Sequence, residues 1–429
     1  MRLQLTMHQS RLVSTRHTAR YRLAAPLSLG FALLALAAPS LAQVVDLDLR
    51  TTLFYEPSSS SELVVLTPAA SLGVTATETF TVRGGYEADI VSGATEAVKS
   101  GPLAPDVISG ATNFDDVRHV GSFGFTINRE NTHLGAGFSY GVENDYRSRA
   151  ITVIAGTDFL QRNTEIELAY ARGFDEVCTT GYRTSDSPTI RSALDSSAGC
   201  FSSADNRAAR DIDLHNLQAA WTQSWTPVLA TQLVLSGSIQ HGFLENPYRS
   251  VIIGPAGDQA LENHPDNRAR AAIALRVKYY VRSLETAFAV GVRGYRDTWD
   301  ILSQTYELSA ERYVLSGLRL MVRARFYDQS GALFWSDDYT GGEPALGLRG
   351  QYWSGDRELS PLRSYLLGAR LRAGFQGRPG DRVAGMLLDL SASVGLDVIK
   401  TDLQEFTWGG IEPDDTIAIA PTVGLSGTF

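Results

Sequence analysis

The sequence contains little lysine, only two cysteines and, beyond its N-terminal region, no long apolar run. After residue 42 there is no stretch of about 20 apolar residues, which excludes a bundle of membrane-spanning helices. A mean hydropathy of -0.09 does not exclude a membrane β-barrel, because barrel strands alternate polar and apolar residues and average near zero. With 44% hydrophobic and 9% aromatic residues, the chain is too apolar to be disordered.

Residues 1–42 are predicted to be a cleaved secretory signal. Three arginines precede an apolar stretch over residues 23–38, and the small residues within 40–42 fit the positions that a signal peptidase reads. A membrane anchor is the alternative, but the apolar core is too short to span a bilayer and contains Pro26 and Gly30.

The chain that remains is acidic. Residues 1–42 hold five of the 38 Lys and Arg and none of the 47 Asp and Glu, which leaves 33 bases, 47 acids and a net charge near -14. Only Lys99, Lys278 and Lys400 are lysines, so almost every base is an arginine. An acidic exported protein is a poor candidate for binding nucleic acid.

Cys178 and Cys200 lie in one segment rich in Ser, Thr, Asp and Gly. In an exported chain, two such cysteines are expected to form a local disulfide. A zinc site is disfavoured, because two isolated thiols without a nearby histidine do not make a tetrahedral ligand set. No histidine or cysteine spacing in the chain predicts a metal site or another cofactor.

Period-two alternation recurs from residue 43 to the C-terminus, whereas helical periodicity is almost absent. In the last such run, the apolar residues Ile417, Ile419, Val423, Leu425 and Phe429 share one face and small or polar residues occupy the other. About 16 runs of this kind begin near residues 43, 60, 75, 116, 132, 146, 162, 208, 229, 268, 283, 301, 316, 361, 384 and 414.

The connections between these runs alternate in length. Long connections follow odd-numbered runs, over residues 90–115, 174–207, 244–267, 331–360 and 399–413, whereas even-numbered runs are followed by tight turns such as 129–131, 226–227, 282–283 and 377–380. Long loops at one end and short turns at the other are typical of outer-membrane barrels. We therefore predict an all-β fold, a single transmembrane antiparallel up-and-down barrel of about 16 strands (14–18) over residues 43–429, with long extracellular loops and short periplasmic turns.

The chain ends in Phe429. A terminal aromatic residue after an alternating strand resembles the signal that the outer-membrane assembly machinery reads, which predicts that machinery and outer-membrane lipid as partners. The alternative is an ordinary buried last strand of a soluble β-sandwich.

Charged residues occupy the face opposite the apolar one. Because a charged side chain facing lipid at mid-depth costs about 2 to 4 kcal/mol for Arg, these charges are expected to face the lumen. They form a predicted basic wall of Arg276, Lys278, Arg293, Arg319, Arg323, Arg325, Arg370 and Arg372. A predicted acidic wall consists of Asp46, Asp48, Glu165, Glu167, Asp211, Asp213 and Asp389. Either the charges only pair with one another, or they make a transverse field that orients or selects solutes.

Eight short segments of the chain together carry a resemblance, namely VSGAT (91–95), ISGAT (108–112), DDVRH (115–119), ENDY (143–146), NPYR (246–249), ENHPDNR (262–268), YRDTW (295–299) and RFYDQSGALF (325–334). As a set they resemble the bacterial family called domain of unknown function 3570, whose members look like outer-membrane β-barrels. The resemblance implies fold and location, and no catalytic residue comes with it. Cys178 and Cys200 lie in a loop that is not part of the resemblance.

Three functions remain open from the sequence. The first is a porin-like pore or passive conduit for small polar solutes in a Gram-negative outer membrane. The second is a structural sheath or docking barrel for a periplasmic or surface partner, for instance a redox protein. The third is a barrel enzyme with an active site at the rim, namely an outer-membrane hydrolase, for which Gly137-Phe138-Ser139-Tyr140-Gly141 matches the G-x-S-x-G pattern and Asp211, Asp213 and His215 share a face. The serine lies inside an alternating run and not at a strand-to-helix turn, which argues against an enzyme.

Overall fold

The computed structural model describes residues 44–57, 62–93, 114–183, 185–201, 206–253, 258–337, 339, 351–376, 383, 387–405 and 415–429. Residues 43–429 form one compact unit. The predicted signal over residues 1–42 lies outside the described residues, so its cleavage stays a prediction.

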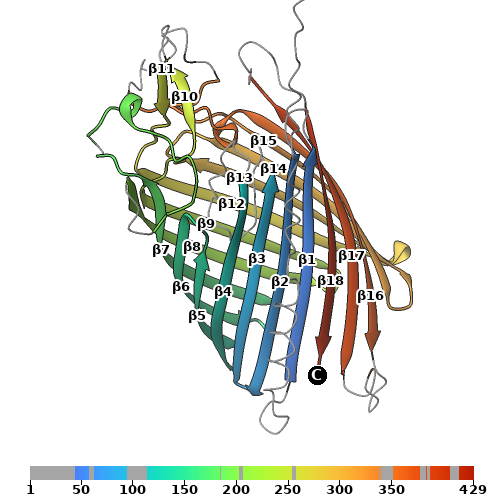
Figure 1. The fold of residues 1–429 in the computed structure, drawn as a ribbon. Coiled ribbons are helices and arrows are strands. Elements are labelled where there is room, and N and C mark those ends of the chain that lie inside the picture. Colours follow the sequence, from blue (N-terminus) through green and yellow to red (C-terminus); the bar gives the residue numbers. More distant parts are fainter. Residues whose placement is uncertain are drawn as a thin grey trace, which may run out of the picture. The chain divides into compact units, whose positions relative to one another are not determined.

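The described strands build one closed antiparallel barrel, in which each strand pairs with its neighbours in the chain and β1 pairs with β18 (Figure 1). Its sixteen described strands confirm the predicted fold class. The strands are β1 (Val44–Pro57), β2 (Glu62–Thr77), β3 (Phe80–Gly93), β4 (Phe114–Arg129), β5 (Thr132–Val142), β6 (Tyr146–Phe159), β7 (Thr164–Thr180), β8 (Arg207–Thr226), β9 (Leu229–Gly242), β12 (Asn267–Val281), β13 (Thr286–Asp297), β14 (Leu302–Leu315), β15 (Leu318–Gln329), β16 (Leu362–Gln376), β17 (Asp389–Leu403) and β18 (Thr416–Thr428).

The predicted strand starts agree closely with the observed ones. The largest offsets are at β3, expected near residue 75 and starting at Phe80, and at β17, expected near residue 384 and starting at Asp389. A turn was predicted at 377–380, but these residues lie outside the described part. Val383 pairs with Leu387 just before β17 begins.

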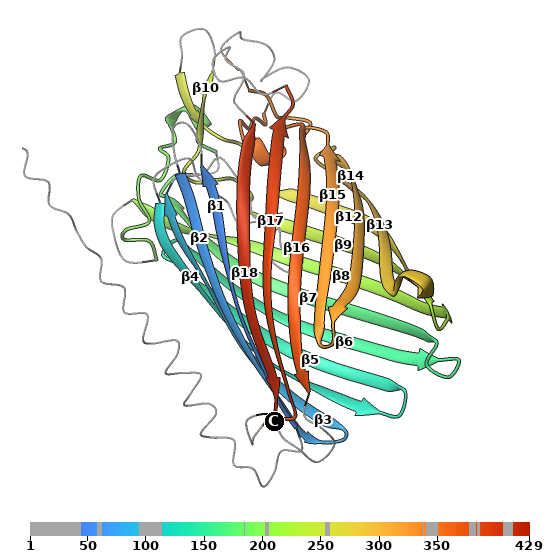
Figure 2. The same ribbon diagram turned by 90° about the vertical axis from the view of Figure 1, so that its right-hand side faces the viewer.

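The connections separate the barrel into two ends, which we call the loop end and the turn end (Figure 2). At the loop end lie the connections β3–β4, β7–β8, β9–β12, β15–β16 and β17–β18. The β9–β12 connection carries a small hairpin of β10 (Ser250–Ile253) and β11 (Asp258–Leu261). Three single 3-10 turns complete the described structure, η1 (Pro188–Ile190), η2 (Arg282–Leu284) and η3 (Arg357–Leu359). Within the described residues, no helix is long and apolar enough to cross a membrane.

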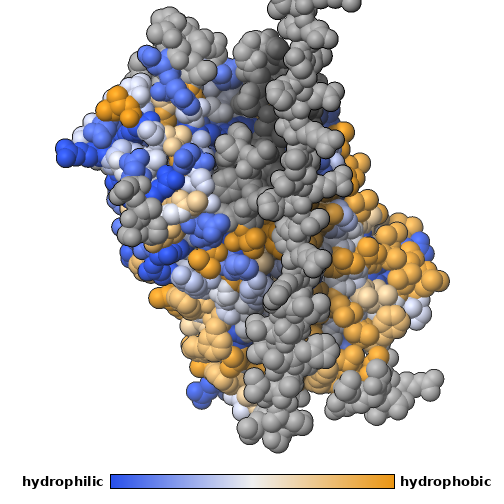
Figure 3. All heavy atoms as spheres, viewed as in Figure 1, coloured by the Kyte–Doolittle hydropathy of each residue, from blue (hydrophilic) through white to orange (hydrophobic). Residues whose placement is uncertain are grey.

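The strand register assigns each residue to one of two faces, because residues directly opposite in an antiparallel pair lie on the same face. One row runs from Arg276 through Gly291, Glu307 and Arg325 to Leu366 on five successive strands. The alternate residues carry large, exposed apolar side chains, and these cover the outside of the barrel where Figure 3 shows hydrophobic surface. The polar rows therefore face the interior.

Candidate functional site

All eight residues of the predicted basic wall lie on inner-face rows of four strands. Arg276 and Lys278 are on β12, Arg293 is on β13, and the remaining five are on β15 and β16. Neighbouring positions on the same strands, such as Leu320 and Val322, carry apolar side chains on the outside.

Two ion pairs of this wall reach across an intervening strand over a glycine. Arg276 on β12 and Glu307 on β14 approach to 3.7 Å, with Gly291 of β13 between them in the register. Arg323 on β15 and Asp397 on β17 approach to 2.7 Å, with Gly368 of β16 between them. On the concave side of a curved sheet, side chains two strands apart converge, and a glycine leaves room for their contact.

The same arrangement occurs on the other side of the barrel. His133 on β5 and Glu167 on β7 are 3.3 Å apart, and Gly156 of β6 lies between them. Arg50 on β1 and Glu87 on β3 are 4.0 Å apart above an alanine of β2. The side chains of Arg50 and Glu87 are 58% and 46% exposed, so solvent reaches the inner face at this level.

Sequence reasoning missed the acids that lie within the basic wall. Glu307 pairs with Arg276, Glu311 with Arg319, and Asp397 with Arg323. None of these acids belongs to a run of acidic residues in the sequence. Only the strand register shows that Glu307 and Asp397 face an arginine two strands away and that Glu311 faces one on the next strand. Positive charge remains after this pairing, because several bases form no ion pair with another described residue, namely Lys278, Arg293, Arg325 and Arg370.

Five of the seven residues predicted for the acidic wall lie on inner-face rows. Asp46 and Asp48 on β1 and Asp389 on β17 flank β18, and Glu165 and Glu167 lie together on β7.

The placement of Asp211 and Asp213 in the lumen was wrong. On β8 these residues pair with Glu176 and Phe174 of β7 on the outer face, and Asp213 contacts the outer-face Arg172 at 3.1 Å. In this segment of β8 the polar residues face outward and the apolar residues face inward, which is the reverse of the usual pattern. The inner-face residues are apolar here because other parts of the protein cover them from inside the barrel.

The residues of the hydrolase alternative do not come together. Ser139 lies on the inner face of β5, opposite Ser122 and Ala150. His215 lies on the outer face of β8, where its Nδ1 is 2.7 Å from the hydroxyl of Tyr170. A serine and a histidine on opposite sides of the wall cannot act on one substrate. Among the described residues there is no group of three His, Cys, Asp or Glu side chains that could hold a metal ion.

The loop end of the interior is filled by protein. Inner-face residues at this level are buried on thirteen of the described strands, whereas inner-face charges nearer the turn end, such as Asp46, Lys278 and Asp389, are exposed. The buried set, one from each strand, is Glu56, Leu63, Asp89, Arg118, Gly141, Asp175, Ile212, Gln240, Asp297, Ser303, Leu362, Leu403 and Thr416.

Two connections supply contacts to this level, and we call their described residues, 243–253, 258–266, 330–337, 339 and 351–361, the loop plug. Phe243 and Leu244 pack against Ile212 and its neighbours on β7 and β8. Trp335 packs against Leu362 and Leu403.

Across the loop plug, η3 joins separate parts of the barrel. Arg357 donates to Glu56 of β1 at 3.3 Å and to Thr416 of β18 at 2.9 Å. The inner-face Gln329 of β15 donates to the carbonyl oxygens of Glu358 and Ser360 at 2.9 and 2.7 Å.

A buried ion pair lies inside the loop plug. His264 Nε2 and Glu262 Oε2 are 3.4 Å apart, and Glu262 also accepts hydrogen bonds from Ser354 Oγ and the Gly355 N–H. Burial alone would lower the pKa of His264, but the hydrogen bond and charge of Glu262 outweigh it and hold that pKa above its ordinary value. Burial would raise the pKa of Glu262, but His264, Arg249 and the Gly355 N–H hold it below its ordinary value.

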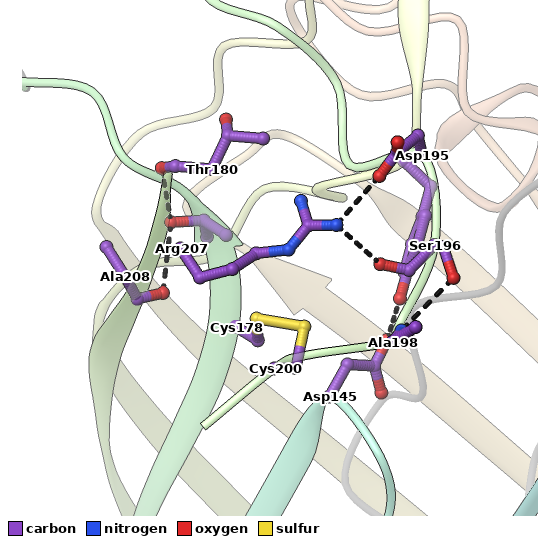
Figure 4. Close-up of a disulfide and its surroundings, with 11 residues drawn as sticks. Asp145, Cys178, Thr180, Asp195, Ser196, Ala198, Cys200, Arg207 and Ala208 are labelled. Carbon is purple, nitrogen blue, oxygen red and sulfur yellow. Dashed lines mark hydrogen bonds and ion pairs between the residues drawn. A yellow bond between two sulfur atoms is a disulfide. The ribbon is translucent and has the colours of Figure 1, made fainter. Parts of the chain in front are cut away.

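The predicted disulfide is present between Cys178, the antepenultimate residue of β7, and Cys200 in the β7–β8 loop (Figure 4). Cys178 is buried, and its backbone N–H donates to the carbonyl of Asp145 at 2.8 Å. From the first position of β8, Arg207 contacts Asp195 of the same loop at 2.8 Å and the carbonyl of Ser196 at 3.2 Å (Figure 4). The disulfide therefore ties the loop to the barrel wall.

Comparison with known proteins supports the resemblance seen in the sequence. A family described as "Protein of unknown function (DUF3570)" matches residues 38–379. The chain belongs to this family. No curated protein matches this DUF3570 chain.

Solved structures of bacterial outer-membrane barrels also match the DUF3570 chain. A bacterial polysaccharide outer membrane secretin is 10% identical with a TM-score of 0.45, over 89% of this chain and 98% of that chain. OccD3 (OpdP) of Pseudomonas aeruginosa is 11% identical with a TM-score of 0.41, over 91% and 92%. OpdK of Pseudomonas aeruginosa, crystallised with vanillate, is 9% identical with a TM-score of 0.39, over 90% and 98%. At these identities and TM-scores, the likeness says nothing about a solute.

Proposed function

We propose that this protein is a passive conduit for small polar solutes in a Gram-negative outer membrane. The observation that best supports this proposal is the solvent exposure of charged side chains on the inner face between the turn end and the loop plug. Arg50, Lys278, Arg293 and Arg370 are all exposed there. A charge that has no ion-pair partner inside a closed barrel requires water around it, so we infer that this part of the interior is a vestibule filled with water.

The two sides of the vestibule differ in charge. The wall of β12–β16 keeps unpaired bases, whereas Asp46 and Asp48 on β1 and Glu165 and Glu167 on β7 make the other side acidic. The resulting transverse field acts on the orientation of polar solutes.

In the proposed topology the loop end faces outward, the turn end faces the periplasm, and residues 1–42 are removed on export. An epitope inserted at Ser187 in the β7–β8 loop should be labelled on intact cells. An epitope in the turn at Glu130 should be labelled only after the outer membrane is permeabilised. Labelling on intact cells at Glu130 but not at Ser187 would show that the topology is the reverse of the one proposed.

Assembly is proposed to depend on Phe429, whose N–H donates to the carbonyl of Val45 at 2.8 Å where β18 meets β1. Deletion of Phe429 should reduce the heat-modifiable barrel in the membrane and leave export intact. Normal assembly of the truncated chain would remove the terminal-signal argument.

Conductance in planar bilayers tests the conduit. Purified protein in 1 M KCl, a concentration chosen to raise the current, is expected to give discrete conductance steps. Absence of current from the wild type and from variants whose loop plug is released would exclude the proposal.

A docking barrel for a periplasmic partner is the second candidate. The observation that favours it is the filled loop end, since a vestibule closed on one side also suits a bound molecule that enters from the turn end. Stable co-purification of one stoichiometric partner, together with absent conductance, would favour this function over the conduit.

A further inference from the structure

The loop plug is anchored differently on its two sides. Beside β13 and β14 it is held by apolar packing, in which Phe334 and Leu359 bury against Trp299 and Ile301 of the β13–β14 connection. Apolar packing of this kind lacks direction and persists through small rotations. The apolar side therefore has the character of a hinge.

On the side that faces β1 and β18, a buried guanidinium contacts the barrel wall. Arg357 is 2% exposed, and its two terminal nitrogens bind Glu56 at the end of β1 and Thr416 at the start of β18. These two strands close the barrel. Such a contact is directional and is lost when either partner moves by a few ångströms.

The position of Arg357 is fixed by its neighbour. Asp356 caps η3 by accepting from the Glu358 N–H at 2.9 Å, and it pairs with Arg249 of the β9–β12 connection at 2.8 Å. The preceding residue, Tyr248, donates to the carboxylate of Asp145 in the β5–β6 connection, which also lies at the loop end. A chain of polar contacts thus crosses the loop end from β1 to β5.

We propose that the loop plug is the gate of the conduit and that Arg357 is the latch that holds it closed. This inference rests on the proposed conduit function. When Arg357 is replaced, the buried carboxylate of Glu56 loses the hydrogen bond and the positive charge of this guanidinium, which is unfavourable until water reaches the carboxylate. Water reaches Glu56 when the η3 side of the loop plug swings away from the seam between β1 and β18, and that movement opens the loop end.

The test replaces Arg357 by methionine, which keeps most of the side-chain volume, and uses Glu56→Gln as a second variant that breaks the same pair from the wall. Arg363→Met is the matched control, because Arg363 forms an ion pair with Asp328 at 2.8 Å on the outer face and does not contact the loop plug. Heat-modifiable mobility establishes that each variant forms the barrel.

Two readouts are measured on each protein. The first is the single-channel open probability in a planar bilayer, which is expected to rise roughly 100-fold in Arg357→Met. The second is hydrogen exchange of the backbone amides of Ser354, Leu359 and Ser360, which donate within the loop plug. These amides should exchange at least about ten times faster in both latch variants than in the wild type. Their exchange rates should be unchanged in Arg363→Met.

The outcomes separate the gate from the conduit. Unchanged exchange in both latch variants overturns the latch. A wild type that already conducts fully, with no rise in the variants, overturns the gate and keeps the conduit. Faster exchange with no current in any protein supports the latch as a contact of the loop plug but overturns both the gate and the conduit.

Discussion

Arg323 and Asp397 form a two-pronged ion pair across the strand that separates them, with Nε to Oδ1 at 3.1 Å and Nη2 to Oδ2 at 2.7 Å. Gly368 occupies the position between them. The contact shows that charge inside this barrel is arranged by the register of three strands, which no single strand segment displays.

Removing one partner of this pair should change ion selectivity in a direction set by the charge that remains. Asp397→Asn leaves Arg323 unpaired beside Arg325 and Arg370, so reversal potentials in a salt gradient should shift toward anions. Arg323→Gln leaves the carboxylate and should shift them toward cations. Each change should cost only about 1 kcal/mol or less of unfolding free energy, because both side chains are partly exposed. Shifts of the same sign in the two variants would contradict the assignment.

Gly368→Ala should be damaging where Gly291→Ala is tolerated. A Cβ at Gly368 would collide with Oδ1 of Asp397, whereas the nearest atom to a Cβ at Gly291 is the Cβ of Glu307 at 3.7 Å, an ordinary contact. We expect Gly368→Ala to lower the free energy of unfolding by about 1 to 3 kcal/mol and Gly291→Ala to leave it nearly unchanged. Urea unfolding of the two variants in detergent or lipid measures the difference, and equal midpoints would argue against the strand-spanning pair.

Loss of the disulfide should act on one loop and leave the barrel closed. The two cysteines are 22 residues apart in the sequence. A disulfide that closes a loop of this size contributes roughly 3 kcal/mol to the free energy of unfolding. In Cys178→Ala/Cys200→Ala, protease cleavage between residues 181 and 206 should accelerate while heat-modifiable mobility is kept. Reduction of the wild type with dithiothreitol should give the same cleavage. A barrel that fails to form without the bridge would show that the disulfide acts on the wall itself.

The loop plug should loosen as pH rises above neutrality. The raised pKa of His264 means that its contribution is present below its ordinary value of 6.5 and is lost as pH rises through the raised value. The lowered pKa of Glu262 means that its contribution is present above 4.5 and is lost as pH falls through the lowered value. The pair therefore stabilises most between about 4.5 and 6.5.

Neighbouring groups act in the same direction at lower pH. Burial raises the pKa of Glu245 and of Asp356, so their ionisation also weakens the loop plug as pH rises, while Arg249 keeps its charge throughout. Hydrogen exchange of the loop plug, corrected for the intrinsic rate, should be faster at pH 8.5 than at pH 6. The His264→Gln variant should show no such change over this interval, and an unaltered pH dependence in that variant would assign the effect to another group.

Strand number, order and the alternation of loops and turns could be predicted from the sequence, because lipid outside and water inside impose period-two alternation on every strand. The assignment of Asp211 and Asp213 failed where that condition ends. Near the loop end the interior is filled with protein, so Ile212 and Leu214 turn inward to apolar partners and the aspartates face outward. Pairs such as Arg323 and Asp397 could not be foreseen, since they depend on the relative stagger of three strands.

The seam between β1 and β18 joins the first strand of the described barrel to its last strand. Glu56 lies on β1 and Thr416 on β18, so the two partners of Arg357 come together only when these two strands have paired. A barrel arrested before its final strand is added lacks Thr416, one of the two partners of Arg357. The complete contact of Arg357 is consequently a late event in assembly, and it forms only when the barrel has closed.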